Sequence, residues 1–235
     1  MSETARYLGY RRASPPDADV SKLIEKAARE MQAAMKPQAV FEIFDLSVIE
    51  PDTPDAGLHG GFDIGSDGAS RQNAPVEHFE RVSEQLCCKG LNHQELRFAD
   101  VTLHSRDLAR NLTGCKQVAL LAATIGPQVD GLIRRHSSLD PVYASILQAT
   151  GAMFIEELVD LVNDEIKKIA AAQGLKTKPR YSPGFGDVPL QVQKDFFRLL
   201  PCTRIGLTLM DTLIMAPEKS VTAFVGLGFP TQAGE

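Results

Sequence analysis

The segment Arg180-Tyr-Ser-Pro-Gly-Phe-Gly-Asp-Val-Pro carries residue types suited to binding a small charged ligand. The planar guanidinium of Arg180 offers two parallel N–H donors, which match the two oxygens of a carboxylate in charge and in orientation. Gly184 lacks a Cβ, so the backbone there can adopt a positive φ and approach a ligand closely. The ring of Phe185 offers a face for a flat or cationic group. Taken alone, the same residues also describe an ordinary surface loop.

Carboxylates that could complement this arginine lie upstream, at Glu156 and Glu157. Both fall in a predicted helix, so a solvated position on the helix surface is an equally good interpretation of either one. The sequence leaves open which of the two glutamates faces a ligand.

The other residues that could do chemistry show no comparable pattern. The five histidines are scattered, with no spacing typical of a zinc or non-haem iron site. We expect the thiols to be buried or incidental, and we expect no metal site. The four cysteines are Cys87, Cys88, Cys115 and Cys202.

The elements that must position these residues interleave helices and strands irregularly. Apolar periodicity predicts a helix over residues 19–36 and a longer one, with a broad apolar face, over 140–173. The near-continuous apolar run 117–126 predicts a strand buried on both faces. This mixture predicts an α+β fold rather than a doubly wound one. Further strands are predicted at 40–48, 95–98, 101–104, 205–209 and 220–227, and further helices at 76–88, 105–112, after Pro127 and at 190–200.

Length and composition favour one ordinary globular domain. The 235 residues fit a single domain, 1–235, with an N-terminal helical segment over 1–38 and a Gly-, Asp-, Ser- and Pro-rich loop excursion over 51–75. A formal net charge of −5 argues against a general nucleic-acid binder, because phosphate contacts need a surplus of Lys and Arg. No apolar run approaches the roughly 20 residues that cross a bilayer, and the N-terminus lacks a secretory pattern. We therefore expect a cytoplasmic protein that binds neither nucleic acid nor membrane.

Four blocks of sequence, in the same order, resemble the activation domain of cobalamin-dependent methionine synthase. The segment from Arg180 resembles the Arg-x-x-x-Gly-Tyr signature of that domain. The resemblance covers most of the chain and is weakest over 51–75. It implies a twisted, bent antiparallel sheet flanked by helices, in agreement with the α+β prediction. The other three blocks are Tyr7-Leu-Gly-Tyr10, Leu121-Ala-Ala-Thr-Ile-Gly126 and Met215-Ala-Pro-Glu-Lys-Ser-Val-Thr-Ala223.

The resemblance also implies which residues hold the ligand of that family, S-adenosylmethionine. Arg180 matches the arginine that holds the methionine carboxylate, and Glu156 matches a glutamate that contacts the ligand. Phe185 stands where the family has tyrosine, so it keeps the ring but lacks the hydroxyl. The remaining implied contacts come from the loop itself, at Tyr181, Ser182, Pro183, Gly184 and Gly186.

The function implied by the resemblance is the reactivation of an oxidised enzyme. The chain would bind S-adenosylmethionine and present its methyl group to cob(I)alamin carried by a partner methionine synthase. Flavodoxin or a similar donor would supply the electron. The task of the chain would be positioning and exclusion of water, with no general acid, general base or covalent nucleophile. Two alternatives stay open: service to another corrinoid methyltransferase, and a non-catalytic docking module that responds to S-adenosylmethionine.

Overall fold

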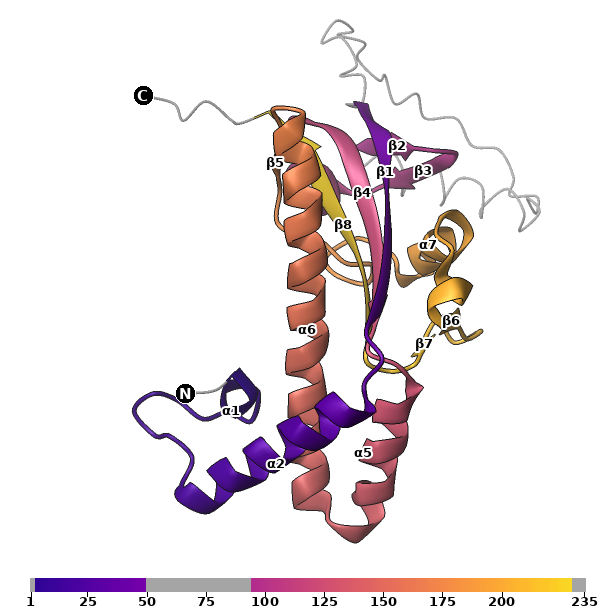
Figure 1. The fold of residues 1–235 in the computed structure, drawn as a ribbon. Helices are drawn as coiled ribbons and strands as arrows, with labels where there is room; N and C mark the ends of the chain where they lie inside the picture. Colours follow the sequence, from indigo (N-terminus) through magenta and orange to yellow (C-terminus); the bar gives the residue numbers. More distant parts are fainter. Residues whose placement is uncertain (1–2, 50–93, 230–235) are drawn as a thin grey trace, which may run out of the picture.

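The computed structural model describes residues 3–49 and 94–229 (Figure 1). Within them, six strands form a sheet in the order β3-β2-β1-β4-β8-β5, and every neighbouring pair is antiparallel. A separate two-stranded ribbon pairs β6 with β7. The strands are β1 (Gln38–Ile49), β2 (Glu95–Phe98), β3 (Val101–His104), β4 (Cys115–Thr124), β5 (Lys176–Thr177), β6 (Thr208–Leu209), β7 (Met215–Ala216) and β8 (Ser220–Gly228).

Helices cover both faces of this sheet. The longest, α6, runs alongside β4 and β8, whereas α7 and the β6–β7 ribbon lie on the opposite side of the sheet (Figure 1). The predicted α+β fold, an antiparallel sheet flanked by helices, is confirmed. The helices are α1 (Glu3–Tyr7), α2 (Ala18–Ala34), α4 (Arg106–Asn111), α5 (Pro127–Leu139), α6 (Pro141–Ala172) and α7 (Gln193–Leu199), with 3₁₀ turns η1 (Leu190–Val192) and η2 (Cys202–Ile205).

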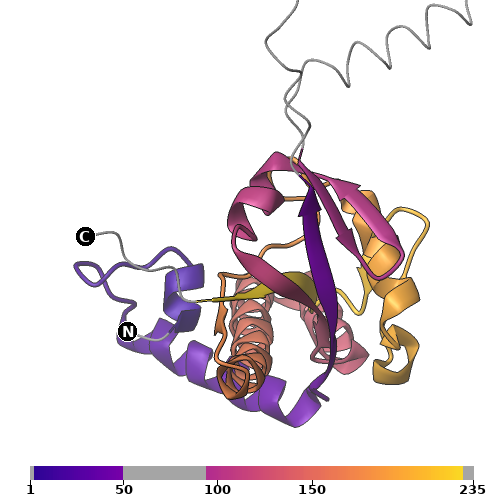
Figure 2. The same cartoon turned by 90° about the horizontal axis from the view of Figure 1, so that it is seen from above.

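Strand β1 links the two parts of the sheet, because it changes partner along its length. Its first part pairs with β4, from Gln38 opposite Thr124 to Asp45 opposite Gln117. Its last part, Leu46–Ile49, pairs with β2 instead. Viewed from above, the yellow strand β8 runs crosswise to the indigo strand β1, so the sheet is strongly twisted (Figure 2).

Two hydrophobic clusters lie on the two faces of the sheet, and β4 belongs to both. Side chains alternate across a strand, so Leu121 and Ala123 of β4 point into the cluster under α6, α5 and α2. Leu120 and Ala122 point into the cluster under α4, α7 and η2. Every residue from Val118 to Thr124 is buried, which confirms the prediction of a strand covered on both faces.

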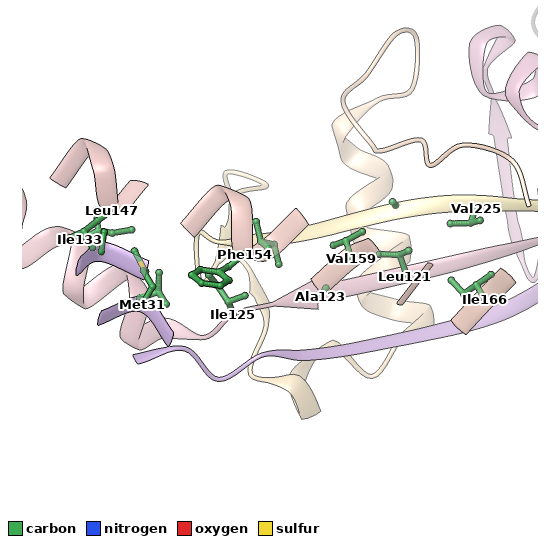
Figure 3. Close-up of a cluster of buried hydrophobic side chains, with 14 of the residues drawn as sticks. Met31, Leu121, Ala123, Ile125, Ile133, Leu147, Phe154, Val159, Ile166 and Val225 are labelled. Carbon is green, nitrogen blue, oxygen red and sulfur yellow. The ribbon is translucent and has the colours of Figure 1, made fainter. Parts of the chain in front are cut away.

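Helix α6 is the main support of the first cluster. The side chain of Asp140 caps it by accepting a hydrogen bond from the Tyr143 amide at 2.9 Å, and Pro141 occupies its first position. Its 32 residues span about 48 Å at 1.5 Å per residue. Phe154, Val159 and Ile166 of α6 pack towards β4 and β8 (Figure 3).

The helices predicted over 19–36 and 140–173 are confirmed as α2 and α6. The strand predicted over 205–209 is wrong for its first half: Cys202–Ile205 form a 3₁₀ turn, and Gly206 at φ 72° redirects the chain, so only Thr208–Leu209 are extended. The predicted helix over 190–200 begins with a 3₁₀ turn and continues as α7. The predicted loop over 51–75, the predicted helix over 76–88, Cys87 and Cys88 lie outside the described residues.

Candidate functional site

The segment that contains Arg180 continues from β5 along the edge of β8 that faces away from β4. After α6 ends, β5 pairs with the last residues of β8, and the Lys178 amide donates to the carbonyl of Gly226 at 2.8 Å. Tyr181 and Phe224 then exchange two backbone hydrogen bonds, of 3.0 and 2.7 Å. The backbone on either side of Arg180 is therefore fixed by the sheet rather than left as a solvent loop.

Beyond Tyr181 the chain makes two consecutive tight turns. The Phe185 amide donates to the Ser182 carbonyl at 3.2 Å, with Pro183 second in the turn and Gly184 third, at φ 87°. Proline followed by a residue of positive φ is the pattern of a type II turn. The expected positive φ at Gly184 is thus confirmed. A second turn joins Val188 to Phe185 at 3.0 Å and places Gly186 at φ 54°.

Arg180 extends from this segment towards α6 and contacts two carboxylates. Its Nη2 donates to Oε2 of Glu156 at 3.0 Å, and its Nη1 donates to Oδ1 of Asp160. Glu156 and Asp160 are four residues apart, so they lie on one face of the helix. The Arg180 side chain is 26% exposed, whereas that of Asp160 is 67% exposed. The guanidinium is therefore held by two carboxylates at a partly shielded position.

The same face of α6 borders a cavity of about 390 Å³ beneath α1, which we call the α1–α6 cavity. The predicted site residue Glu156 lines it, and so does Tyr7 from the first of the four sequence blocks. Four of its seven lining side chains are acidic and one is basic. Glu3 pairs with Arg6, and Glu156 and Asp160 pair with Arg180, so Glu157 is the one acidic lining residue without an ion-pair partner among the described residues. Its lining residues are Glu3, Arg6, Tyr7, Met153, Glu156, Glu157 and Asp160.

Tyr181 lies on the other side of the sheet from Arg180. Its ring packs against the second hydrophobic cluster, because adjacent residues of an extended segment point to opposite faces. A methyl group at Gly186 would overlap the Tyr181 hydroxyl and lie 2.6 Å from Oδ2 of Asp107, so this glycine admits the ring. Burial, and then the carboxylates of Asp107 and Asp187, raise the pKa of Tyr181.

Asp187 fastens the second turn to α4. Its carboxylate accepts hydrogen bonds from the Ser105 hydroxyl, from the Arg106 amide at 2.8 Å and from the Asp107 amide at 3.2 Å. Burial acts to raise the pKa of Asp187, but these hydrogen bonds outweigh it and hold the pKa below its ordinary value. Sequence reasoning did not assign this role to Asp187, although Ser105 immediately before a short helix is a recognisable capping signal.

The predicted site residues are therefore divided between two places. Arg180 and Glu156 are brought together beside the α1–α6 cavity, and Glu156 rather than Glu157 contacts the arginine. The loop residues Tyr181, Ser182, Pro183, Gly184, Phe185 and Gly186 do not line that cavity. Phe185 is 68% exposed at the tip of the turns. Asp160, Tyr7 and Met153 were missed, and the spacing of Asp160 from Glu156 was the signal that could have found it.

The other candidates for chemistry in the described residues are the two cysteines and any cluster of metal ligands. Cys115 and Cys202 are buried and free, and burial raises the pKa of both thiols, that of Cys202 to about 11. No group of three or more His, Cys, Asp or Glu side chains there is arranged to hold a metal ion. No helix in the described part of the chain is both long and apolar enough to cross a membrane.

Comparison with known proteins supports the fold. No protein-family model matches the chain, and no curated protein matches it. Among solved structures, the chain is similar to the crystal structure of the MetH reactivation domain bound to AdoHcy. The two share a TM-score of 0.53 and 14% sequence identity, over 97% of this chain and 70% of that one. Similarity at this level of identity establishes a common fold.

Proposed function

We propose that the chain binds S-adenosylmethionine in the α1–α6 cavity, with Arg180 and Glu156 holding its amino-acid end. The observation that carries this proposal is the ion pair between these two residues at the border of a ligand-sized cavity. The structural neighbour was solved with AdoHcy, which is S-adenosylmethionine without its transferable methyl group. Cavities of about 300–1,000 Å³ are typical of small-molecule sites.

The pairing of Arg180 with Glu156 suits a zwitterionic ligand. An α-carboxylate can replace Glu156 on the guanidinium while the α-ammonium takes the released Glu156 carboxylate, so every charge stays paired. The existing pair is easily opened, because solvent-accessible ion pairs contribute only about 0–1 kcal/mol. Asp160 remains on the other nitrogen of the guanidinium and keeps it oriented towards the ligand.

The rest of the cavity suits the sulfonium end of the ligand. Tyr7 and Met153 offer apolar surface, and the ring of Tyr7 can face a cation. Glu157 adds negative charge near this surface, whereas the charge of Glu3 is paired with that of Arg6. S-adenosylmethionine carries one net positive charge, so an acidic cavity favours it over the neutral AdoHcy.

The reaction that we assign to this site is methyl transfer to a corrinoid substrate carried by a partner protein. S-adenosylmethionine supplies an activated methyl group, so the chain has only to hold the sulfonium in place and limit access of water. We propose a cobalamin-dependent methionine synthase as the partner, in a reductive reactivation that draws its electron from flavodoxin or a similar donor. Another corrinoid methyltransferase would use the same site in the same way.

One feature favours a second candidate, a non-catalytic module that docks on corrinoid proteins when S-adenosylmethionine is bound. The aromatic residue of the signature is Phe185, which has no hydroxyl and lies exposed at the tip of the turns. Such a residue can contact a partner without ordering a ligand.

Calorimetry and a label-transfer assay separate these functions. S-adenosylmethionine should bind the chain with one-to-one stoichiometry, and failure to bind would refute both candidates. With methyl-labelled S-adenosylmethionine and a reduced, cobalamin-loaded methionine synthase, the reactivation function predicts label on the corrinoid that depends on this chain. Binding of the ligand without label transfer would leave the docking module and exclude the catalytic function.

A further inference from the structure

A second cavity lies on the other side of Glu157 and Asp160, between the end of α2, the start of β1 and α6. We call it the α2–α6 groove. Its volume is about 380 Å³, and it shares only Glu157 and Asp160 with the α1–α6 cavity. Ten residues line it: Gln32, Met35, Pro37, Ile125, Phe154, Glu157, Leu158, Asp160, Leu161 and Asp164.

The floor of this groove is apolar. Phe154 and Ile125 are buried beneath it, and Met35 and Leu158 are half-buried along its sides. Leu161 is 66% exposed in the middle of α6. Removing an exposed leucine side chain from water is favourable, so a second surface that covers Leu161 gains binding energy there.

The rim of the groove is acidic. Glu157, Asp160 and Asp164 stand along it, and none of the ten lining residues is basic. Asp160 contacts Arg180, and Asp164 contacts Lys167 at 2.7 Å, both from outside the groove. Glu157 has no ion-pair partner in the part of the chain that the structure describes. An apolar floor inside a rim of one charge sign is the anatomy of a protein–protein interface that selects the opposite sign.

We propose that the α2–α6 groove docks a basic, amphipathic helical segment of a partner protein. An apolar side chain of that segment would cover Leu161 and enter the groove, and its lysines or arginines would pair with Glu157 and Asp164. Glu157, Leu161 and Asp164 follow one another at four and three residues, which is the spacing that an opposing helix presents. This docking requires no S-adenosylmethionine, so it stands or falls independently of the proposed ligand site.

The test uses the full chain and a fluorescein-labelled synthetic helix with leucines on one face and lysines beside them. Fluorescence anisotropy should show saturable binding that weakens as salt is added. Leu161→Asp should weaken it at least about tenfold. Leu139→Asp is the matched control, because Leu139 is a 76% exposed leucine on α5 outside the groove, and it should bind the peptide as the wild type does.

Any one of the following outcomes would overturn the proposal. The first is no saturable binding of this peptide by the wild type. The second is equal weakening by Leu161→Asp and Leu139→Asp, or equal binding of a peptide whose leucines are replaced by asparagine. The third is a wild-type dimer in sedimentation velocity that Leu161→Asp dissociates, which would make a second copy the occupant.

If circular dichroism shows that Leu161→Asp does not fold, the double variant Glu157→Gln, Asp164→Asn takes its place. It should reduce both the affinity for the peptide and the salt dependence of that affinity.

Discussion

Nη2 of Arg180 lies 3.0 Å from Oε2 of Glu156, across 24 positions of sequence. The contact joins the edge of the sheet to the middle of α6, and its carboxylate side lines the α1–α6 cavity. Because the ion pair is accessible to solvent, it contributes little to stability. Its proposed value is functional: it keeps a donor and an acceptor for the two ends of an amino acid close together before the ligand arrives.

Replacing Arg180 with alanine should weaken binding of S-adenosylmethionine with little effect on folding. Loss of a charge-assisted contact to the ligand carboxylate costs about 2–4 kcal/mol, or at least about thirtyfold in Kd. Calorimetry on Arg180→Ala measures this. Arg198→Ala is the matched control, because Arg198 also contacts two carboxylates, Asp100 and Asp195, away from the cavity. Equal affinities for Arg180→Ala and Arg198→Ala would remove Arg180 from the site.

Glu156 and Glu157 should differ in what their removal does to ligand selectivity. Glu156→Gln should weaken S-adenosylmethionine and AdoHcy alike, because both carry the ammonium that it is proposed to hold. Glu157→Gln should weaken only the cationic S-adenosylmethionine, by about two- to fivefold at low salt, because it removes a nearby charge rather than a contact. Competition calorimetry with the two ligands measures the ratio. A ratio unchanged by Glu157→Gln would place the sulfonium elsewhere.

Asp187→Asn should destabilise the fold in a way that depends on pH. The native pKa of Asp187 lies below the ordinary carboxyl value of 3.8, so its stabilising effect is fully present above that value. The effect is lost as the pH falls through the native pKa. Urea unfolding should show a gap between wild type and variant at pH 7 that shrinks below about pH 4. Asp211→Asn is the control, since Asp211 is exposed and makes no hydrogen bond or ion pair with the described residues. A gap between wild type and Asp187→Asn that is the same at every pH would contradict this prediction.

Gly186→Ala should be more destabilising than Gly206→Ala. Both glycines have positive φ, 54° and 72°, so alanine costs about 1–2 kcal/mol of backbone strain at either. Only at Gly186 would the added methyl group also displace Tyr181 and Asp107, whereas no atom lies within 4 Å of it at Gly206. The difference in free energy of unfolding between the two variants isolates this crowding. We expect about 1 kcal/mol or more, and equal losses would show that the ring moves freely.

Much of the fold could be predicted from the sequence, because its signals are strong and local. The run 117–126 is almost entirely apolar, and α6 keeps an apolar face over its whole length, so both elements could be predicted from the sequence. Residues 205–209 were predicted to be a strand because three of the five are apolar. Only the backbone, with Gly206 at φ 72°, shows that the chain turns there. The change of partner along β1, from β4 to β2, could not be predicted, because both partners lie far away in sequence.

The candidate site was harder to predict than the fold. The pairing of Arg180 with Glu156 followed from resemblance alone, since no local pattern links positions on a helix and on a sheet edge. The contact of Asp160 with Arg180 could have been predicted, because Asp160 lies four residues after Glu156 and so on the same face of the helix. The placement of Tyr181 was also within reach, since it is adjacent to Arg180 in an extended segment and must point the other way. The cavity beneath α1 depends on tertiary packing and has no signature in sequence.

The position of β4 in both hydrophobic clusters has a consequence for how the molecule unfolds. One face of β4 contributes to the first cluster and the other face to the second. Neither cluster can therefore unfold without disrupting a strand that the other cluster needs. Residues of β4 should therefore be among the last amides to exchange with deuterium, and at the global rate. We therefore expect the two layers to unfold as one cooperative unit, so that a destabilising substitution in either cluster lowers the melting temperature of both.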